Sequence, residues 1–147
     1  MSVRPIRVRD LGSISDMWEV FTHEKDPDAK TDKDSFEAQT LQIMLQTDYM
    51  GFVAEDEYGV AVGFVDGIVI YEAAVSEWSY QGRHSWVELE ERGKGYGREM
   101  YEAVLAALNE RDIQSLQSTG GPGLPAIEAV TGRTADIVGK VWKIRMD

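Results

Sequence analysis

A glycine-rich turn, Arg92-Gly93-Lys94-Gly95-Tyr96-Gly97, constrains the fold of this chain more than any other segment. Before it, residues 85–89 place Val87 and Leu89 on one face, at the two-residue period of a β-strand. After it, apolar residues recur at helical spacing, at Met100, Tyr101, Val104, Leu105 and Leu108. The order of strand, turn and helix therefore predicts a βα unit.

The backbone of such a turn suits an anion. The first N–H groups of a helix have no partner within the helix, and the helix dipole adds partial positive charge at the same end. Residues 92–98 contain Arg92, Lys94 and Arg98 and no carboxylate, although the chain carries a formal net charge of -11. We therefore predict that the turn binds phosphate.

Two common phosphate motifs do not match this turn. A Walker loop has Ser or Thr after its Gly-Lys pair, but here Gly95 follows Lys94. A dinucleotide-binding fingerprint that begins at Gly95 and Gly97 would need a third glycine where Met100 stands. The pattern that remains is Arg-x-x-Gly-x-Gly.

This pattern belongs to a longer resemblance. Residues 87–97, Val-Glu-Leu-Glu-Glu-Arg-Gly-Lys-Gly-Tyr-Gly, resemble the acyl-CoA signature V-x-P-x-x-R-G-x-G-x-G/A of the GNAT N-acyltransferase superfamily, with Leu89 in place of the proline. Residues 3–118 are similar to the family in the order of their elements. The resemblance implies an α/β (α+β) fold over residues 1–147, with one mixed, largely antiparallel sheet flanked by helices.

The expected elements follow from the same patterns. Strands are predicted at 4–8, 51–55, 60–71, 84–89, 113–118 and 137–145, and helices at 11–23, 35–46, 96–109 and 124–131. Asp10 is the expected N-cap of the first helix, and an acidic loop, 24–34, joins the first two helices. With 43% hydrophobic residues in 147, one soluble domain is expected.

Composition excludes several classes of function. The chain has no cysteine, so disulfides, thiolate metal sites and a cysteine nucleophile are excluded, and its two histidines are too few for a histidine metal cluster. The acidic charge argues against nucleic acid. No apolar run approaches the roughly 20 residues of a membrane span, and no signal-peptide core is present, so we expect a cytoplasmic protein without membrane partners.

The resemblance implies direct transfer of an acetyl group from acetyl-CoA, as co-substrate, to a primary amine in a ternary complex. It implies cofactor-binding roles for Val87, Leu89, Arg92, Gly93, Lys94, Gly95, Tyr96, Gly97 and Arg98. The turn would hold the pyrophosphate, and the backbone at 87–89 would pair with the pantetheine arm. The acidic surface favours a cationic acceptor, but solubility alone also explains the charge.

Proton removal needs its own group, because an amine with a pKa of about 10.4 is almost entirely protonated at pH 7. Glu88 and His84, which share a predicted strand face with Trp86, are the candidate bases. A solvated Glu88, or a His84 ring that only packs beside a tryptophan, is the alternative. Tyr80, in a predicted loop, is the candidate acid, whereas Tyr101 is expected in the core.

Two positions depart from the family. With Ala126-Ile127 aligned, Gly123 and Val130 replace the Asn and the Tyr that members commonly carry, and that Tyr protonates the departing thiolate. The sequence therefore leaves two functions open, an active N-acetyltransferase or a catalytically degenerate GNAT-fold protein that serves as a CoA sensor or a structural or binding module. The acceptor is not specified. The strand at 141–144 could pair with a second copy as a homodimer, or it could close its own sheet.

Overall fold

In the computed structural model, the described residues are 2–118, 128, 131–132, 136–138 and 141–146. A seven-stranded sheet, in the order β1-β2-β3-β4-β5-β7-β6, forms its centre. The strands are β1 (Ser2–Pro5), β2 (Asp48–Glu55), β3 (Ala61–Glu72), β4 (Glu77–Val87), β5 (Ser115–Ser118), β6 (Asp136–Val138) and β7 (Val141–Arg145). Only the β4–β5 pair is parallel, which confirms the predicted mixed, largely antiparallel sheet.

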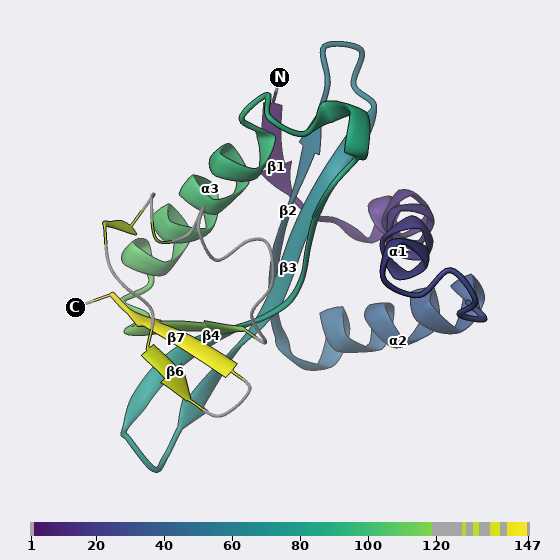
Figure 1. Cartoon of the computed structure of the whole chain (residues 1–147). Helices are drawn as coiled ribbons and strands as arrows, with labels where there is room; N and C mark the ends of the chain where they lie inside the picture. The colour runs from purple at the N-terminus through teal and green to yellow at the C-terminus, as the bar shows by residue number, and fades with distance from the viewer. Residues whose placement is uncertain (1, 119–127, 129–130, 133–135, 139–140, 147) are drawn as a thin grey trace.

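Helices cover both faces of this sheet. α1 (Leu11–Lys25) and α2 (Lys33–Gln46) lie on one side and α3 (Tyr96–Glu110) on the other (Figure 1). The predicted stripe of α3 is buried, and Met100, Val104 and Leu108 are fully enclosed against the sheet. A second core, which includes Ile14 and Phe36, packs α1 and α2 on the opposite face. None of the described helices has the length and apolar character needed to cross a membrane.

Three strand predictions need correction. The first strand, predicted at 4–8, is β1 at residues 2–5, and residues 8–10 form a 3-10 turn. The last predicted strand, 137–145, is instead the antiparallel pair β6 and β7. β4 begins at Glu77 and not at residue 84, because the whole length of β3 from Gly63 to Glu72 pairs with it. Tyr80 therefore lies in a strand and not in a loop. Most of the predicted helix at 124–131 falls outside the described residues.

Asp10 is the N-cap residue of α1, as predicted, but its side chain makes no capping hydrogen bond to the helix. Its carboxylate accepts hydrogen bonds from Nη1 and Nη2 of Arg4, at 2.9 and 2.7 Å, and from the backbone N–H of Arg7, at 2.8 Å. The short 3-10 turn η1 (Val8–Asp10) precedes the helix and directs the carboxylate back toward β1. The guanidinium of Arg4 is also the main reason why the pKa of Asp10 is lowered.

β4 contains an irregularity that shapes the centre of the sheet. Asp66 of β3 pairs with His84, and Gly67 pairs with Gly82, so Arg83 is an extra residue in β4, as in a β-bulge. Beyond this point β4 and β5 separate, since β5 pairs only with Ser79–Gln81. On that side, no strand of the described part of the chain pairs with residues 82–87, which we call the free edge of β4.

Candidate functional site

The glycine turn (residues 92–97) has the backbone conformation predicted for anion binding. Gly93 and Gly95 have φ angles of 84° and 95°, in the left-handed region that glycine adopts without strain. α3 begins directly afterwards, and its first intrahelical hydrogen bond is from Glu99 N–H to the Gly95 carbonyl, at 3.0 Å. The N–H groups of residues 96–98 therefore have no acceptor within the helix and are available to a ligand.

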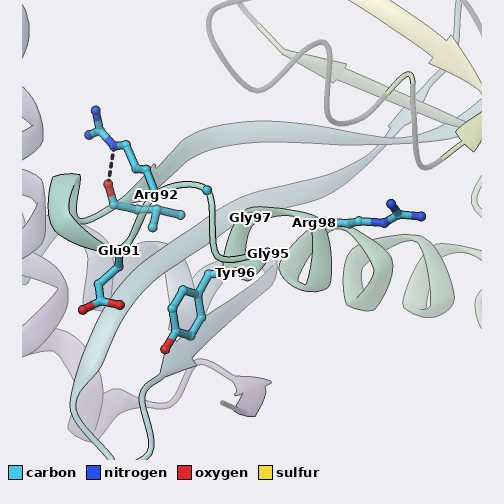
Figure 2. Close-up of a pocket in the computed structure, with 8 residues that line it drawn as sticks. Glu91, Arg92, Gly95, Tyr96, Gly97 and Arg98 are labelled. Atoms are coloured by element: carbon cyan, nitrogen blue, oxygen red, sulfur yellow. Dashed lines mark hydrogen bonds between the residues drawn. The ribbon is translucent and has the colours of Figure 1, made fainter.

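A cavity of about 370 Å³ opens at this turn. Its lining joins the end of β4 to the first turn of α3 and consists of Val87, Glu91, Arg92, Gly93, Gly95, Tyr96, Gly97 and Arg98. Figure 2 shows Arg92 on the opposite side of the loop from Glu91 and Tyr96. Most of the residues that the sequence predicted for cofactor binding are thus brought together in one place.

The side chain of Arg92 links the end of β4 to α1. Its Nε donates to the Val87 carbonyl at 2.8 Å, and its Nη2 donates to both carboxylate oxygens of Glu24 in α1, at 3.0 and 2.8 Å. The indole N–H of Trp86 donates to Glu24 as well, at 3.1 Å. The Arg92 hydrogen bond is the main reason why the pKa of Glu24 is lowered.

The other two cations of the turn also face carboxylates. Lys94 pairs with Glu91 at 2.9 Å, and Arg98 pairs with Glu102 at 3.0 Å. The sequence window 92–98 contained no acidic residue, so these partners were not anticipated. Because all three side-chain charges are partly balanced, the backbone N–H groups supply the main attraction for an anion.

The structure separates the two candidate bases. His84 lies in β4, half-buried, and its Nδ1 is 2.9 Å from Asp66 Oδ1. Its ring contacts the phenylalanine rings of α1, α2 and β3. Glu88 lies beyond the end of β4 with an exposed side chain, because the chain turns there into the 3-10 turn η2 (Leu89–Glu91).

The two tyrosines differ in their partners. Tyr80 is 1% exposed and its hydroxyl donates to the Met50 carbonyl at 3.2 Å, and burial raises its pKa well above the ordinary value. Tyr80 is therefore a core residue of β4 that is closed to solvent, and it is not placed to act as the general acid. Tyr101 is buried as predicted, and its hydroxyl donates to Ser85 Oγ, on the free edge of β4, at 2.5 Å.

Sequence reasoning missed Asp66, the buried carboxylate beside His84. The sequence signal for a functional Asp66 is weak, since a single Asp within the apolar run 60–71 is also compatible with an ordinary strand. Gly123 and Val130, the positions that depart from the family pattern, lie outside the described residues. In the described part of the chain, no group of three or more His, Asp or Glu side chains could hold a metal ion.

Comparison with known proteins agrees with this geometry. The model of the Acetyltransferase (GNAT) family matches residues 14–129. A search of curated protein sequences finds no match. Solved structures, in contrast, match over most of the chain at low sequence identity.

Three of these structures illustrate the likeness. A ribosomal-protein-alanine N-acetyltransferase from Brucella melitensis biovar Abortus has a TM-score of 0.73 and 18% identity, with 93% of this chain and 94% of that one covered. A predicted acetyltransferase from Clostridium acetobutylicum, solved with acetyl-CoA, has a TM-score of 0.73, 12% identity and coverages of 87% and 86%. An aminoglycoside acetyltransferase from an uncultured soil metagenomic sample has a TM-score of 0.72, 14% identity and coverages of 93% and 91%. The match of the family model over most of the chain, on a fold shared with these enzymes, shows that the chain belongs to the GNAT acetyltransferase family.

Proposed function

We propose that this protein is an N-acetyltransferase that moves an acetyl group from acetyl-CoA to a primary amine by direct attack in a ternary complex. One observation carries the proposal. The glycine turn, with its unpartnered N–H groups, lies directly beyond the free edge of β4. These two features match the two ends of the donor, because the pyrophosphate needs hydrogen-bond donors and the amide-containing arm needs a strand edge.

The glycine turn would hold the pyrophosphate through backbone groups. The N–H groups of residues 96–98 converge at the start of α3, where the helix dipole adds partial positive charge. Gly93 and Gly95 have no Cβ, and nothing within 4 Å fills the space where one would stand. Phosphate oxygens can therefore approach the backbone closely.

The free edge of β4 would hold the pantetheine arm. Residues 82–87 offer backbone donors and acceptors, as a strand edge does to an added strand. The Val87 carbonyl already accepts a hydrogen bond from Arg92, so the backbone groups that remain for the arm lie before Val87 in β4. The acetyl thioester would then lie near His84 and Ser85, and a backbone N–H of this edge can polarise its carbonyl.

His84 would remove the proton from the amine. His84 lies three residues before Val87, which is about 10 Å along a strand and therefore away from the end of β4 where the pyrophosphate would bind. Glu88 is exposed beyond the end of β4, on the side of the pyrophosphate, and is the weaker candidate. The thiolate product has a pKa near 8.5 and can leave without an acid, so the loss of the usual Tyr would lower the rate without abolishing it.

The overall charge supports a cationic acceptor. A net charge of -11 raises the local concentration of ammonium groups at the surface. Polyamines and lysine-containing peptides are therefore the first acceptors to try. Thiol release from acetyl-CoA in their presence measures the transfer directly.

A matched pair of variants tests the donor site. Gly95→Asn and Gly95→Asp have the same shape, and both residues tolerate the left-handed conformation better than other side chains. Only the aspartate places a negative charge in the turn. We expect calorimetric titration to show that Gly95→Asp binds acetyl-CoA at least about tenfold more weakly than Gly95→Asn, which is about 1.4 kcal/mol.

The outcomes separate the alternatives. Equal binding by the two variants contradicts a phosphate site at the glycine turn, and no binding by the wild type contradicts the transferase. Binding without thiol release for any amine supports the degenerate CoA-binding protein instead.

A further inference from the structure

The bulge in β4 brings two consecutive side chains to one carboxylate. Successive residues of a regular strand point to opposite faces. Because Arg83 is the extra residue of the bulge, its Nη1 and the Nδ1 of His84 both reach Asp66, at 3.1 and 2.9 Å. The irregularity of the strand thus builds a specific cluster.

Asp66 is completely buried within this cluster. A buried carboxylate is unfavourable unless it is paired and hydrogen-bonded. The guanidinium of Arg83 balances its charge at Oδ2, and the hydroxyl of Tyr49 donates to the same oxygen at 2.9 Å. The other oxygen, Oδ1, is left to His84 alone among the described residues.

The ring of His84 is held on several sides. Phe21 of α1, Phe36 of α2 and Phe64 of β3 lie with ring centroids 6.1, 5.8 and 5.8 Å from it. Among the described residues, Nε2 has no hydrogen-bond partner. The side chain as a whole is 15% exposed. One nitrogen of His84 is therefore anchored on Asp66, while the other has no hydrogen-bond partner in the described part of the chain.

We propose that Asp66 is a positioning residue that sets the tautomer and orientation of His84 for proton removal. By accepting a hydrogen bond from Nδ1–H, it leaves Nε2 of the neutral ring unprotonated and able to take a proton. The same carboxylate stabilises the imidazolium that forms when Nε2 takes a proton. This inference rests on the proposed N-acetyltransferase function.

The step balances as follows. Nε2 takes one proton from the ammonium group, and the lone pair that this frees on the amine nitrogen forms the C–N bond to the thioester carbon. The C–S bond breaks, and its electron pair leaves with the sulfur. The nitrogen loses its second proton to the departing thiolate, directly or through water, and His84 returns its own proton to solvent.

A double-mutant cycle tests whether Asp66 acts through His84. We expect His84→Gln to lower kcat about 100-fold, within the usual range for a general base, and Asp66→Asn to lower it at least about tenfold. KM for acetyl-CoA should stay within about twofold. The double variant should be no slower than His84→Gln, because a residue that acts only through the ring loses its effect once the ring is absent.

Nitrogen-15 spectra of the imidazoles give a second readout that needs no substrate. The chain has only two histidines, so His84→Gln assigns the signals. We expect the wild type to carry its proton on Nδ1 of His84, and Asp66→Asn to shift it toward Nε2, because the amide can donate to Nδ1. Tyr49→Phe removes a different hydrogen bond from the same carboxylate and should leave the tautomer unchanged.

Three results would each contradict the role of Asp66 as a positioning residue. A wild-type His84 protonated on Nε2, an unchanged kcat in Asp66→Asn, or additive losses in the double variant would overturn the role of Asp66. The wild-type spectrum alone suffices if Asp66→Asn does not fold. A protein that binds acetyl-CoA but acetylates no amine contradicts the transferase function, whereas the spectrum still decides whether Asp66 orients His84.

Discussion

Arg92 Nε donates a 2.8 Å hydrogen bond to the carbonyl oxygen of Val87, so the arginine of the glycine turn is tied to the last residue of β4. The same guanidinium holds Glu24 near the end of α1. One side chain therefore connects the candidate donor site to the helix that covers the opposite face of the sheet.

This arrangement predicts that the geometry of Arg92 matters more than its charge. Arg92→Lys keeps the charge but loses the planar fork that reaches two acceptors, so the turn should be held less firmly. We expect a three- to tenfold weaker affinity for acetyl-CoA, about 1 kcal/mol, by calorimetric titration. Glu24→Gln is the control. It removes only the charge of an exposed ion pair, which contributes about 0–1 kcal/mol, so we expect a smaller loss of affinity for acetyl-CoA than in Arg92→Lys. Unaltered affinity in Arg92→Lys would count against a positioning role for the guanidinium.

Asp10 should make stability depend on pH at the acidic end. Its folded-state pKa lies below the ordinary value of 3.8, so its contribution is complete above that pH and is lost as the pH falls through the folded pKa. Asp10→Asn should cost about 2 kcal/mol at pH 7, as expected for hydrogen bonds to a charged group. In urea unfolding, the gap to the wild type should shrink below pH 3.8.

Asp16→Asn is the matched control for Asp10. Asp16 pairs with Lys33 at 3.0 Å, but its side chain is 69% exposed. Such a surface pair should contribute less than about 1 kcal/mol. Equal losses from the two substitutions would argue that Asp10 has no special part in anchoring β1.

Gly67 lies beside the bulge, at a point of β3 where β4 leaves no room for a side chain. A Cβ atom there would lie 2.4 Å from the carbonyl oxygen of Gln81 and 2.6 Å from the ring of Tyr80. Gly67→Ala should therefore lower stability by about 2 kcal/mol or more, through overpacking at the bulge. Gly12→Ala in α1, where only one side-chain atom lies within 4 Å, should instead raise it by about 0.5–1 kcal/mol. Thermal unfolding of the two variants should shift in opposite directions.

Thr40 offers a stabilising substitution away from the candidate site. Its hydroxyl is fully buried in α2 and, within the described part of the chain, has no hydrogen-bond partner. Thr40→Val should raise stability by about 1 kcal/mol, because an unsatisfied polar group is removed. Thr47→Val loses a 2.6 Å hydrogen bond to the Ile43 carbonyl and should not stabilise. A loss of stability in Thr40→Val would indicate that an internal water satisfies the hydroxyl.

Local sequence signals predicted the glycine turn and the helix that follows it. The left-handed φ angles at Gly93 and Gly95, and the buried stripe of α3, follow from residues adjacent in the chain. The same local reasoning placed Asp10 correctly at the N-cap position of α1 but not its carboxylate, which binds Arg4 and the backbone of Arg7 instead of the helix. It also misplaced Tyr80, since the length of β4 depends on how far β3 extends as its partner.

The order of strand, glycine turn and helix at residues 85–110 could be predicted without a structure, because helical period, strand alternation and glycine freedom depend on near neighbours. Which carboxylates meet which cations depends on the packing of distant segments. Glu24 and Arg92 lie 68 residues apart, and Asp66 meets His84 only through the register of β3 and β4 and the bulge at Arg83. Such pairings depend on how distant segments align, and a shift of one residue in a strand would point every side chain to the other face.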